Sequence, residues 1–150
     1  MKRSIRAATS ADVSAMMVLE EHAVTAAHWS FGQYEALFRE SDPSRTALVI
    51  EEESQVQGFI VARMIGMEWE IENIAIAGPA RRRGLGTRLL GELLDRARMK
   101  AVRAVFLEVR ESNHAARALY EKWSFLESGR RPKYYRNPEE DAILYRLDFN

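Results

Sequence analysis

The segment Arg81-Arg82-Arg83-Gly84-Leu85-Gly86-Thr87 joins a strand-like run to the most strongly helical run of the chain. The helical run covers residues 85–99, in which leucines at three- and four-residue spacing form one broad apolar face. Glycine permits positive φ and close approach of a ligand to the backbone, and the first turn of a helix presents unpaired N–H groups. With three arginines beside them, these groups favour a pyrophosphate site. A glycine-rich turn with a solvated basic run is the alternative.

Two common phosphate motifs do not fit this segment. A P-loop needs the pattern G-x-x-x-x-G-K-[ST], which the sequence lacks. The dinucleotide-binding fingerprint G-x-G-x-x-G needs a third glycine where this chain has Leu89. A phosphate ligand here would therefore be held in another way.

Strand-like runs precede the segment and cover residues 46–51, 59–64 and 68–77. A turn is expected at Gln55–Gly58, between the first two runs. In the third run the alternation of apolar residues slips between Ile71 and Ile74. One extra residue in a strand produces such a slip, so we expect a β-bulge near Glu72 and Asn73.

Two helices are predicted before these strands. The first begins at Ser10–Asp12 and runs to about His22, and a short extended stretch around Ile5 precedes it. Ser30 and Gln33 have the spacing of a capping box and predict the start of the second helix.

The pattern after residue 99 predicts a buried strand at residues 104–109 and a helix capped by Asn113. Two further strands, at residues 125–130 and 142–148, are expected to be joined by a long polar loop. The alternation of strand-like and helix-like runs predicts one mixed α/β domain over residues 1–150.

Two residues after the segment are candidates for proton transfer. Glu108 lies in an otherwise apolar strand, where desolvation makes a carboxylate a better proton acceptor. An ion pair with Arg110, or an exposed position, is the alternative. Tyr120 lies on the following helix, where it is either a phenolic proton donor or an aromatic core residue.

The composition excludes several kinds of chemistry. The 150 residues include 22 basic and 22 acidic side chains, and a net charge of zero argues against general binding to nucleic acid or an anionic membrane. The chain has no cysteine, which excludes disulfides, cysteine-ligated metals and a cysteine nucleophile. The histidines have no metal-ligand spacing, so no metal is expected; they are His22, His28 and His114. No run approaches the roughly 20 apolar residues of a membrane helix, and a soluble, cytoplasmic protein is expected.

In combination, these motifs resemble the GCN5-related N-acetyltransferase (GNAT) superfamily. Residues 81–86 fit its pyrophosphate-loop pattern [Q/R]-x-x-G-x-[G/A], and Asn73-Ile74-Ala75-Ile76 is similar to the strand before that loop. Within the superfamily the chain is most similar to the RimI type, the ribosomal-protein-alanine N-acetyltransferases. That similarity rests on Leu107-Glu108-Val109-Arg110-Glu111-Ser112-Asn113, Ala118-Leu119-Tyr120-Glu121, Tyr134-Tyr135 and Glu140-Asp141-Ala142-Ile143. It covers essentially the whole chain. One departure is Ser124, where relatives usually have glycine, and backbone strain is expected there.

The resemblance implies a mixed, mostly antiparallel sheet with helices on both faces. Two neighbouring parallel strands, at residues 68–77 and 104–109, would splay apart into a V that admits acetyl-CoA. The implied cofactor-binding residues are Ile74, Ala75, Ile76, Arg81, Arg82, Arg83, Gly84, Leu85, Gly86, Thr87 and Asn113.

The implied reaction is direct acetyl transfer from acetyl-CoA to a primary amine in a ternary complex. Glu108 would take the proton of the amine, a backbone N–H near Ile76 would polarise the thioester carbonyl, and Tyr120 would protonate the departing thiolate. The implied acceptor is the N-terminal α-amine of a protein, most often a ribosomal protein. The acidic side chains of Glu68, Glu70, Glu72, Glu139, Glu140 and Asp141 would receive a basic tail or would be plain solvated surface.

Other functions remain open from the sequence. A small amine or a lysine side chain is an alternative acceptor, although a lysine amine, with a pKa of about 10.4, needs a stronger base. A second alternative is an acyl-CoA-binding module without catalysis. A third is an RNA-binding domain that uses residues 81–83 and 130–136, against which the zero net charge argues.

Overall fold

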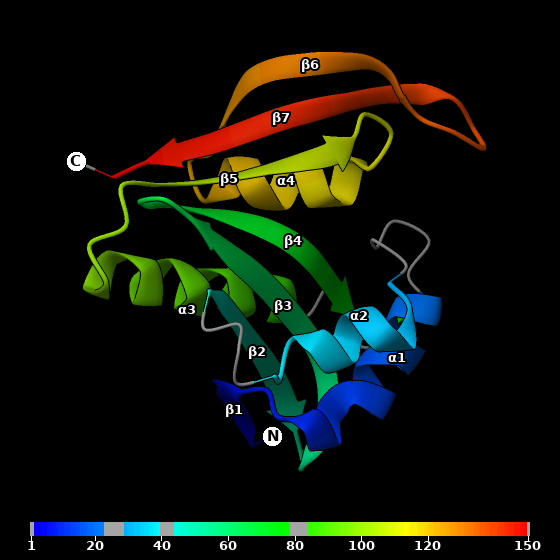
Figure 1. Ribbon diagram of the computed structural model, residues 1–150, viewed down its shortest axis with the longest axis vertical. Helices are drawn as coiled ribbons and strands as arrows, with labels where there is room; N and C mark the ends of the chain where they lie inside the picture. Colours follow the sequence, from blue (N-terminus) through cyan, green and yellow to red (C-terminus); the bar gives the residue numbers. More distant parts are fainter. Residues whose placement is uncertain (1, 23–28, 40–43, 79–83, 150) are drawn as a thin grey trace.

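A computed structural model describes residues 2–22, 29–39, 44–78 and 84–149. In this part of the chain, seven strands form one sheet in the order β1-β2-β3-β4-β5-β7-β6 (Figure 1). The strands are β1 (Arg3–Ala7), β2 (Arg45–Glu52), β3 (Gln55–Ile65), β4 (Glu68–Ile76), β5 (Ala104–Arg110), β6 (Leu126–Tyr135) and β7 (Glu140–Asp148). The helices are the short η1 (Ser10–Asp12), α1 (Val13–Glu21), α2 (Phe31–Ala36), α3 (Leu85–Met99) and α4 (His114–Lys122).

Helices cover both faces of the sheet (Figure 1). On one face, α1 and α2 enclose a core with β2, β3 and β4 that includes Met16, Tyr34 and Phe59. On the other face, the leucines of α3 and Tyr120 of α4 belong to one larger core. The expected α/β architecture is confirmed. None of the helices in the described ranges is long and apolar enough to cross a membrane.

The strands β4 and β5 are parallel and separate after a short contact. They pair only at Glu68 with Ala104, Trp69 with Val105 and Glu70 with Phe106. Beyond these pairs, β4 continues beside β3 and β5 continues beside β7. The other strand pairs are antiparallel. The V between residues 68–77 and 104–109 is therefore confirmed.

The expected β-bulge lies in β4. Val61 of β3 is opposite Asn73, and the next residue, Ala62, is opposite Ile71, so that Glu72 is the extra residue. Before the bulge, Ile71 faces the core under α3; after it, Ala75 faces the core under α1 and α2. The bulge thus reverses which side chains of β4 point to each face of the sheet, just before β4 reaches the V.

The helix predictions are confirmed. The helix α3 covers residues 85–99, and its leucines are buried. Ser30 Oγ accepts a hydrogen bond from the Gln33 N–H at 3.2 Å, and the Gln33 side chain completes the capping box. Asn113 Oδ1 accepts from the Ala116 N–H at 3.1 Å and caps α4.

The turn predicted at Gln55–Gly58 is wrong. These residues belong to β3, and the turn lies at Glu53 and Ser54, which have positive φ angles of 49° and 67°. Gly58 is needed for close packing rather than for a turn. A Cβ atom at this position would lie 2.5 Å from Ile76 Cδ1 on β4.

The long polar loop predicted between residues 130 and 142 is also wrong. The strand β6 continues to Tyr135, β7 begins at Glu140, and residues 136–139 join them. Nearly every side chain of β6 is exposed because β6 is an edge strand that pairs only with β7. A strand exposed on both faces has no apolar alternation, so its charged residues resemble those of a loop.

The expected strain at Ser124 is present, with φ at 71°. Ser124 follows α4 in a Schellman motif: its N–H donates to the Glu121 carbonyl at 3.0 Å, and the Phe125 N–H donates to the Tyr120 carbonyl at 3.1 Å. The Phe125 and Tyr120 rings lie 5.7 Å apart and complete the motif. Glycine is favoured at this position because an L side chain is unfavourable in the left-handed region.

We expect Ser124→Gly to raise the free energy of unfolding by about 0.5–1 kcal/mol, because it relieves the left-handed strain without removing a contact of the motif. Urea unfolding measures the change. The control Ser124→Ala keeps the strain and should remain within about 0.5 kcal/mol of the wild type. A destabilised Ser124→Gly protein would contradict this explanation.

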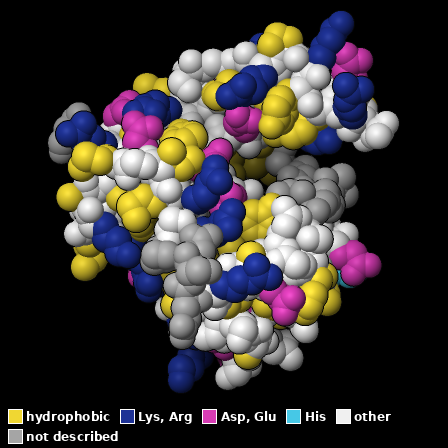
Figure 2. Space-filling model, viewed as in Figure 1, with side chains coloured by type: hydrophobic (Ala, Val, Ile, Leu, Met, Phe, Trp, Pro, Cys, Tyr) yellow, Lys and Arg dark blue, Asp and Glu magenta, His cyan; other side chains and the backbone are white. Residues whose placement is uncertain are grey.

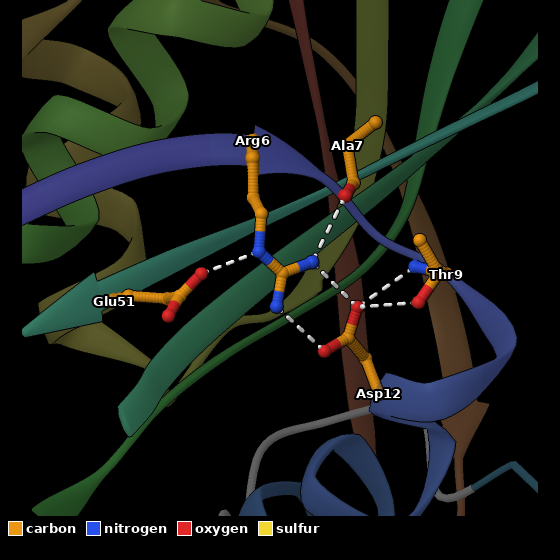
Figure 3. Close-up of polar contacts among 5 residues, drawn as sticks. All are labelled: Arg6, Ala7, Thr9, Asp12 and Glu51. Carbon is orange, nitrogen blue, oxygen red and sulfur yellow. Dashed lines mark hydrogen bonds and ion pairs between the residues drawn. The ribbon is translucent and has the colours of Figure 1, made fainter. Parts of the chain in front are cut away.

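A network of charged groups fastens β1 to β2 and η1 (Figure 3). The Arg6 guanidinium donates to both carboxylate oxygens of Asp12 at 2.8 Å, and its Nε donates to Glu51. The Thr9 N–H also donates to Asp12, at 2.7 Å. Asp12 is buried, and the hydrogen bonds from Arg6 lower the pKa of its carboxyl group below the usual range. The folded chain therefore binds this proton more weakly than the unfolded chain does.

This difference predicts how stability depends on pH. The contribution of Asp12 is fully present above its unfolded pKa of about 3.9 and is lost as the pH falls through the lower folded value. We expect Asp12→Asn to lower the free energy of unfolding by about 1–2 kcal/mol at pH 7, and by less as the pH approaches 3. Denaturant unfolding across this range tests the prediction, and a difference that does not change with pH would refute it.

Candidate active site

The candidate site lies in the V between β4 and β5. Figure 2 shows the surface hollowed in the region where Figure 1 places this gap, below β5 and β7. The Ala77 N–H donates to the Gln57 carbonyl on β3 at 2.7 Å. Since successive residues of a strand direct their backbone groups to opposite edges, Ile76 and Ile74 direct theirs toward the side from which β5 departs.

The N-terminus of α3 faces the same region. Gly84 is the N-cap residue with a φ angle of 78°, and as a glycine it has no side chain to cap the helix. The first turn contains Leu85, Gly86 and Thr87. A Cβ on Gly86 would lie 3.5 Å from Leu119 Cδ2 on α4 and 3.7 Å from Ile76 Cγ1 on β4. Three elements thus meet at Gly86, where the N–H groups and dipole of α3 favour an anion.

Some predicted residues lie outside the described ranges, namely Arg81, Arg82, Arg83 and His28. Asn113 uses its side-chain oxygen to cap α4, and its predicted role toward pantetheine stays a prediction. No group of three or more His, Asp or Glu side chains placed to hold a metal ion occurs within the described part of the chain.

Glu108 lies on β5, on the face opposite to Leu107 and Val109, which belong to the core under α3. Its side chain is 22% exposed, and Arg131 Nε donates to its Oε1 at 2.8 Å. Arg110 pairs instead with Glu140, at 3.1 Å. The carboxylate is therefore partly exposed and ion-paired. Arg131 is opposite Ala142 of β7, and its side chain reaches Glu108 across that strand.

Tyr120 lies on α4, on the face of the sheet that α3 covers. It is buried, and its ring lies 5.7 Å from that of Phe125 and 6.1 Å from that of Tyr145. Burial raises the pKa of the Tyr120 phenol well above its usual value, so the group keeps its proton at neutral and mildly alkaline pH. The site thus has a carboxylate on one face of the sheet and a neutral phenol on the other.

Tyr135, at the end of β6, is a functional candidate that the sequence reasoning did not assign. Burial and then the charge of Glu108 raise its pKa to about 12, and Tyr135 in turn contributes to the raised pKa of Tyr120. The Arg110 guanidinium lies 4.3 Å from its ring centroid. Tyr135 is therefore within electrostatic reach of both proton-transfer candidates. In the sequence, the Tyr134-Tyr135 pair, which supported the family resemblance, was the feature that pointed to Tyr135.

The acidic residues expected to meet a basic tail have partners within the chain. Glu68 pairs with Arg146, Glu70 with Arg63 at 3.2 Å, and Glu72 with Arg45 at 2.8 Å. Asp141 pairs with Arg130 at 2.8 Å, and Glu139 lies 4.0 Å from Lys133. Glu68, Glu70, Glu72 and Asp141 are therefore not available to a basic tail without a competing cation, whereas Glu139 is exposed surface.

The arrangement can hold an anion at α3, present backbone groups of β4 to a ligand in the V, and move protons at Glu108 and Tyr120. Comparison with known proteins shows the family. A family model described as "Acetyltransferase (GNAT) family" matches residues 14–125, and the chain belongs to this family.

Several curated relatives are ribosomal-protein N-acetyltransferases. The [ribosomal protein bS18]-alanine N-acetyltransferase of Haemophilus influenzae is 38% identical over 119 residues, which cover 77% of this chain and 79% of that protein. A putative enzyme of the same name from Bacillus subtilis is 33% identical, over 73% of this chain and 72% of that protein. An uncharacterized protein of Mycobacterium leprae is 47% identical over 81 residues, and the match covers only 22% of its length.

Solved structures show the same fold. The crystal structure of the ribosomal-protein-S18-alanine N-acetyltransferase from Escherichia coli has a TM-score of 0.87 and 29% identity, and the match covers 98% of this chain and 94% of that one. Ard1 from Thermoplasma volcanium has a TM-score of 0.89 and 25% identity, with 100% and 99% of the two chains covered.

Proposed function

We propose that this protein transfers the acetyl group of acetyl-CoA to the N-terminal α-amine of a protein, and that the acceptor is a small-subunit ribosomal protein with an N-terminal alanine. The observation that carries the proposal is the placement of Glu108 and Tyr120 on opposite faces of the sheet beside the V. The names of the Haemophilus influenzae and Escherichia coli relatives support the choice of acceptor. The proposed place of action is the cytoplasm, where ribosomal proteins are made.

The proposed cofactor site follows the edge of β4 and the start of α3. Backbone groups of Ile74 and Ile76 would bind the acetyl and pantetheine portion, whereas those of Ala75 are directed to β3. The N–H groups of residues 84–87 would bind the pyrophosphate. Residues 81–83 would add positive charge, and Asn113 would contact the pantetheine arm. When bound, acetyl-CoA supplies an activated acyl group as a thioester.

Side-chain and backbone groups of the protein would then transfer the protons while one bond forms and another breaks. An α-amine with a pKa of about 7.7–8 is largely protonated at neutral pH, and Glu108 would take its proton directly or through water. The amine nitrogen forms a bond to the carbonyl carbon, and the carbon–sulfur bond then breaks. The nitrogen releases its second proton to water, and Tyr120 regains from water the proton that it gives to the thiolate. The N–H of Ile76 would stabilise the oxyanion, and Tyr120 would give its proton to the thiolate. Because the chain has no cysteine to hold the acetyl group, we expect both substrates to be bound together rather than an acetyl group carried by another residue.

The ion pair of Glu108 with Arg131 bears on the choice between functions. An incoming ammonium group would compete with the Arg131 guanidinium for the Glu108 carboxylate.

The RNA-binding alternative is disfavoured because Arg130 and Arg131 are both engaged with carboxylates. A lysine or small-amine acceptor, and acyl-CoA binding without catalysis, are outcomes that the experiments below distinguish from the proposal.

We expect Glu108→Gln to lower turnover about 10²-fold or more while acetyl-CoA binding is preserved. The loss should shrink as the pH rises, since more amine is then already neutral. Tyr120→Phe should also lower turnover, because the thiolate then lacks its proton donor. The raised pKa of Tyr120 also predicts that the wild-type rate does not fall below pH 10 through ionisation of this phenol. Steady-state rates from pH 6 to 10, measured with an alanine-terminated peptide, test these expectations. Turnover within twofold of the wild type in Glu108→Gln would rule out the mechanism.

We expect Gly86→Val to weaken acetyl-CoA binding at least about tenfold, because its branched side chain would project between Ile76 and Leu119 and obstruct the backbone of the first turn. Calorimetric titration with acetyl-CoA measures this change. The control Gly86→Ala should fold normally, since its Cβ makes ordinary contacts of 3.5 and 3.7 Å. Unchanged affinity in a folded Gly86→Val protein would refute the cofactor site.

A further inference from the structure

A buried carboxylate lies outside the groups that the proposed mechanism uses. Glu20, near the end of α1, is 4% exposed. Its Oε1 accepts a hydrogen bond from the Trp29 backbone N–H at 2.6 Å and another from Asn73 Nδ2 at 3.0 Å. Asn73 Nδ2 is also 3.4 Å from the hydroxyl of Tyr34, a fully buried residue of α2. Glu20 thus connects α1, the start of α2 and the middle of β4.

Burying a carboxylate is unfavourable unless hydrogen bonds replace its lost water. The core that α1 and α2 form with β3 and β4 is apolar and includes Met16, Val61 and Ala75. Burial, and then the negative charge and hydrogen bond of Glu20, raise the pKa of the Tyr34 phenol far above its usual value, which agrees with the contacts. A hydrophobic side chain would fill this position at lower cost, so a role in fixing geometry accounts for the carboxylate better than a role in stability.

The position of Asn73 connects this cluster to the active site. Asn73 directly follows Glu72, the extra residue of the bulge, and directly precedes Ile74. The bulge determines which backbone groups of β4 point toward the V, and a shift by one residue would exchange them. The hydrogen bond from Asn73 to Glu20 holds Asn73 on the α1 and α2 face. Ile74 and Ile76 are thereby held with their backbone groups directed toward the gap.

The second hydrogen bond acts on the other side of the site. Trp29 immediately precedes Ser30, the N-cap residue of α2. Glu108 lies on the sheet face that α1 and α2 cover, so the same carboxylate fixes a helix on the face from which the amine would approach Glu108. One buried group therefore sets both the acyl-binding edge and the position of α2.

We infer that Glu20 is a positioning residue for acetyl transfer, which acts through Asn73 on the Ile74–Ile76 backbone and through Trp29 on the start of α2. This inference rests on the proposed function. It requires Glu20 to influence the rate of the chemical step without touching either substrate. The affinity for acetyl-CoA should depend little on Glu20, because the proposed pyrophosphate site at the start of α3 is separate from the groups that Glu20 contacts.

Glu20→Met and the matched control Glu52→Met test the inference, because methionine is similar in size to glutamate but has no oxygen to accept the two hydrogen bonds. Glu52 is also 4% exposed, but it pairs with Arg3 at 2.7 Å, between β1 and β2. We expect Glu20→Met to lower kcat at least about tenfold, to change the KM for acetyl-CoA less than threefold, and to lose the same factor at every pH from 6 to 9. This constant factor distinguishes it from Glu108→Gln. Glu52→Met should keep kcat within about twofold even if its melting temperature falls as far as that of Glu20→Met.

The conservative variant Glu20→Gln provides the rescue. Because both hydrogen bonds end on Oε1, the side-chain oxygen of a glutamine can still accept from Trp29 and Asn73. We expect Glu20→Gln to recover at least half of the kcat that Glu20→Met loses, measured on a logarithmic scale. If Glu20→Met does not fold, Asn73→Ala provides the same test and should show the same loss of kcat.

The outcomes separate this inference from the proposed function. If the wild-type protein transfers no acetyl group to any free α-amine, the proposed function is refuted. With an active wild type, a Glu20→Met kcat within twofold, or equal losses in Glu20→Met and Glu52→Met, would overturn the inference alone. A loss in Glu20→Gln as large as that in Glu20→Met would overturn it as well.

Discussion

The brief parallel contact between β4 and β5 is the constraint on which the rest of the structure depends. Three residue pairs join these strands, and each strand then stays with its antiparallel neighbour. A sheet divided in this way would separate unless other elements held its halves together. On one face, α3 and α4 do so: they pack so closely that a Cβ on Gly91 would lie 2.7 Å from the Trp123 ring. At the closed end, Arg146 of β7 pairs with Glu68 of β4 across β5.

The opening that results explains the arrangement of chemical groups. Where β4 leaves β5, the backbone groups of Ile74 and Ile76 are directed toward the V rather than toward β3. The helix α3 follows β4 in the chain, and α4 follows β5. Glu108 lies on the sheet face that α1 and α2 cover, and Tyr120 lies on the face that α3 covers. The proposed proton acceptor and proton donor therefore come from opposite faces of the sheet.

Local patterns in the sequence predicted much of this fold. The leucine spacing of α3, the caps at Ser30 and Asn113 and the slip of alternation at the β4 bulge each depend on residues a few positions apart. The failures concerned long-range context. The extent of β6 depends on pairing with β7 rather than on its own pattern, and Gly58 is glycine because of Ile76 on the neighbouring strand.

The same distinction applies to the site. The sequence identified Glu108 and Tyr120, but not Arg131, which is 23 residues from Glu108 and reaches it only through the pairing of β6 with β7. Tyr135 had no assigned role because its proximity to both groups is a tertiary feature. Glu20 had the helical spacing of a core position, and only the fold shows that its partners are Trp29 and Asn73.

The most direct measurement is acetyl transfer to a pair of peptides, followed by intact mass. Both peptides begin with alanine and contain one internal lysine, and one has its α-amine blocked. With acetyl-CoA present, the account predicts one acetyl group on the free peptide and none on the blocked one. Acetylation of the blocked peptide, or bound acetyl-CoA without transfer to either peptide, would contradict it.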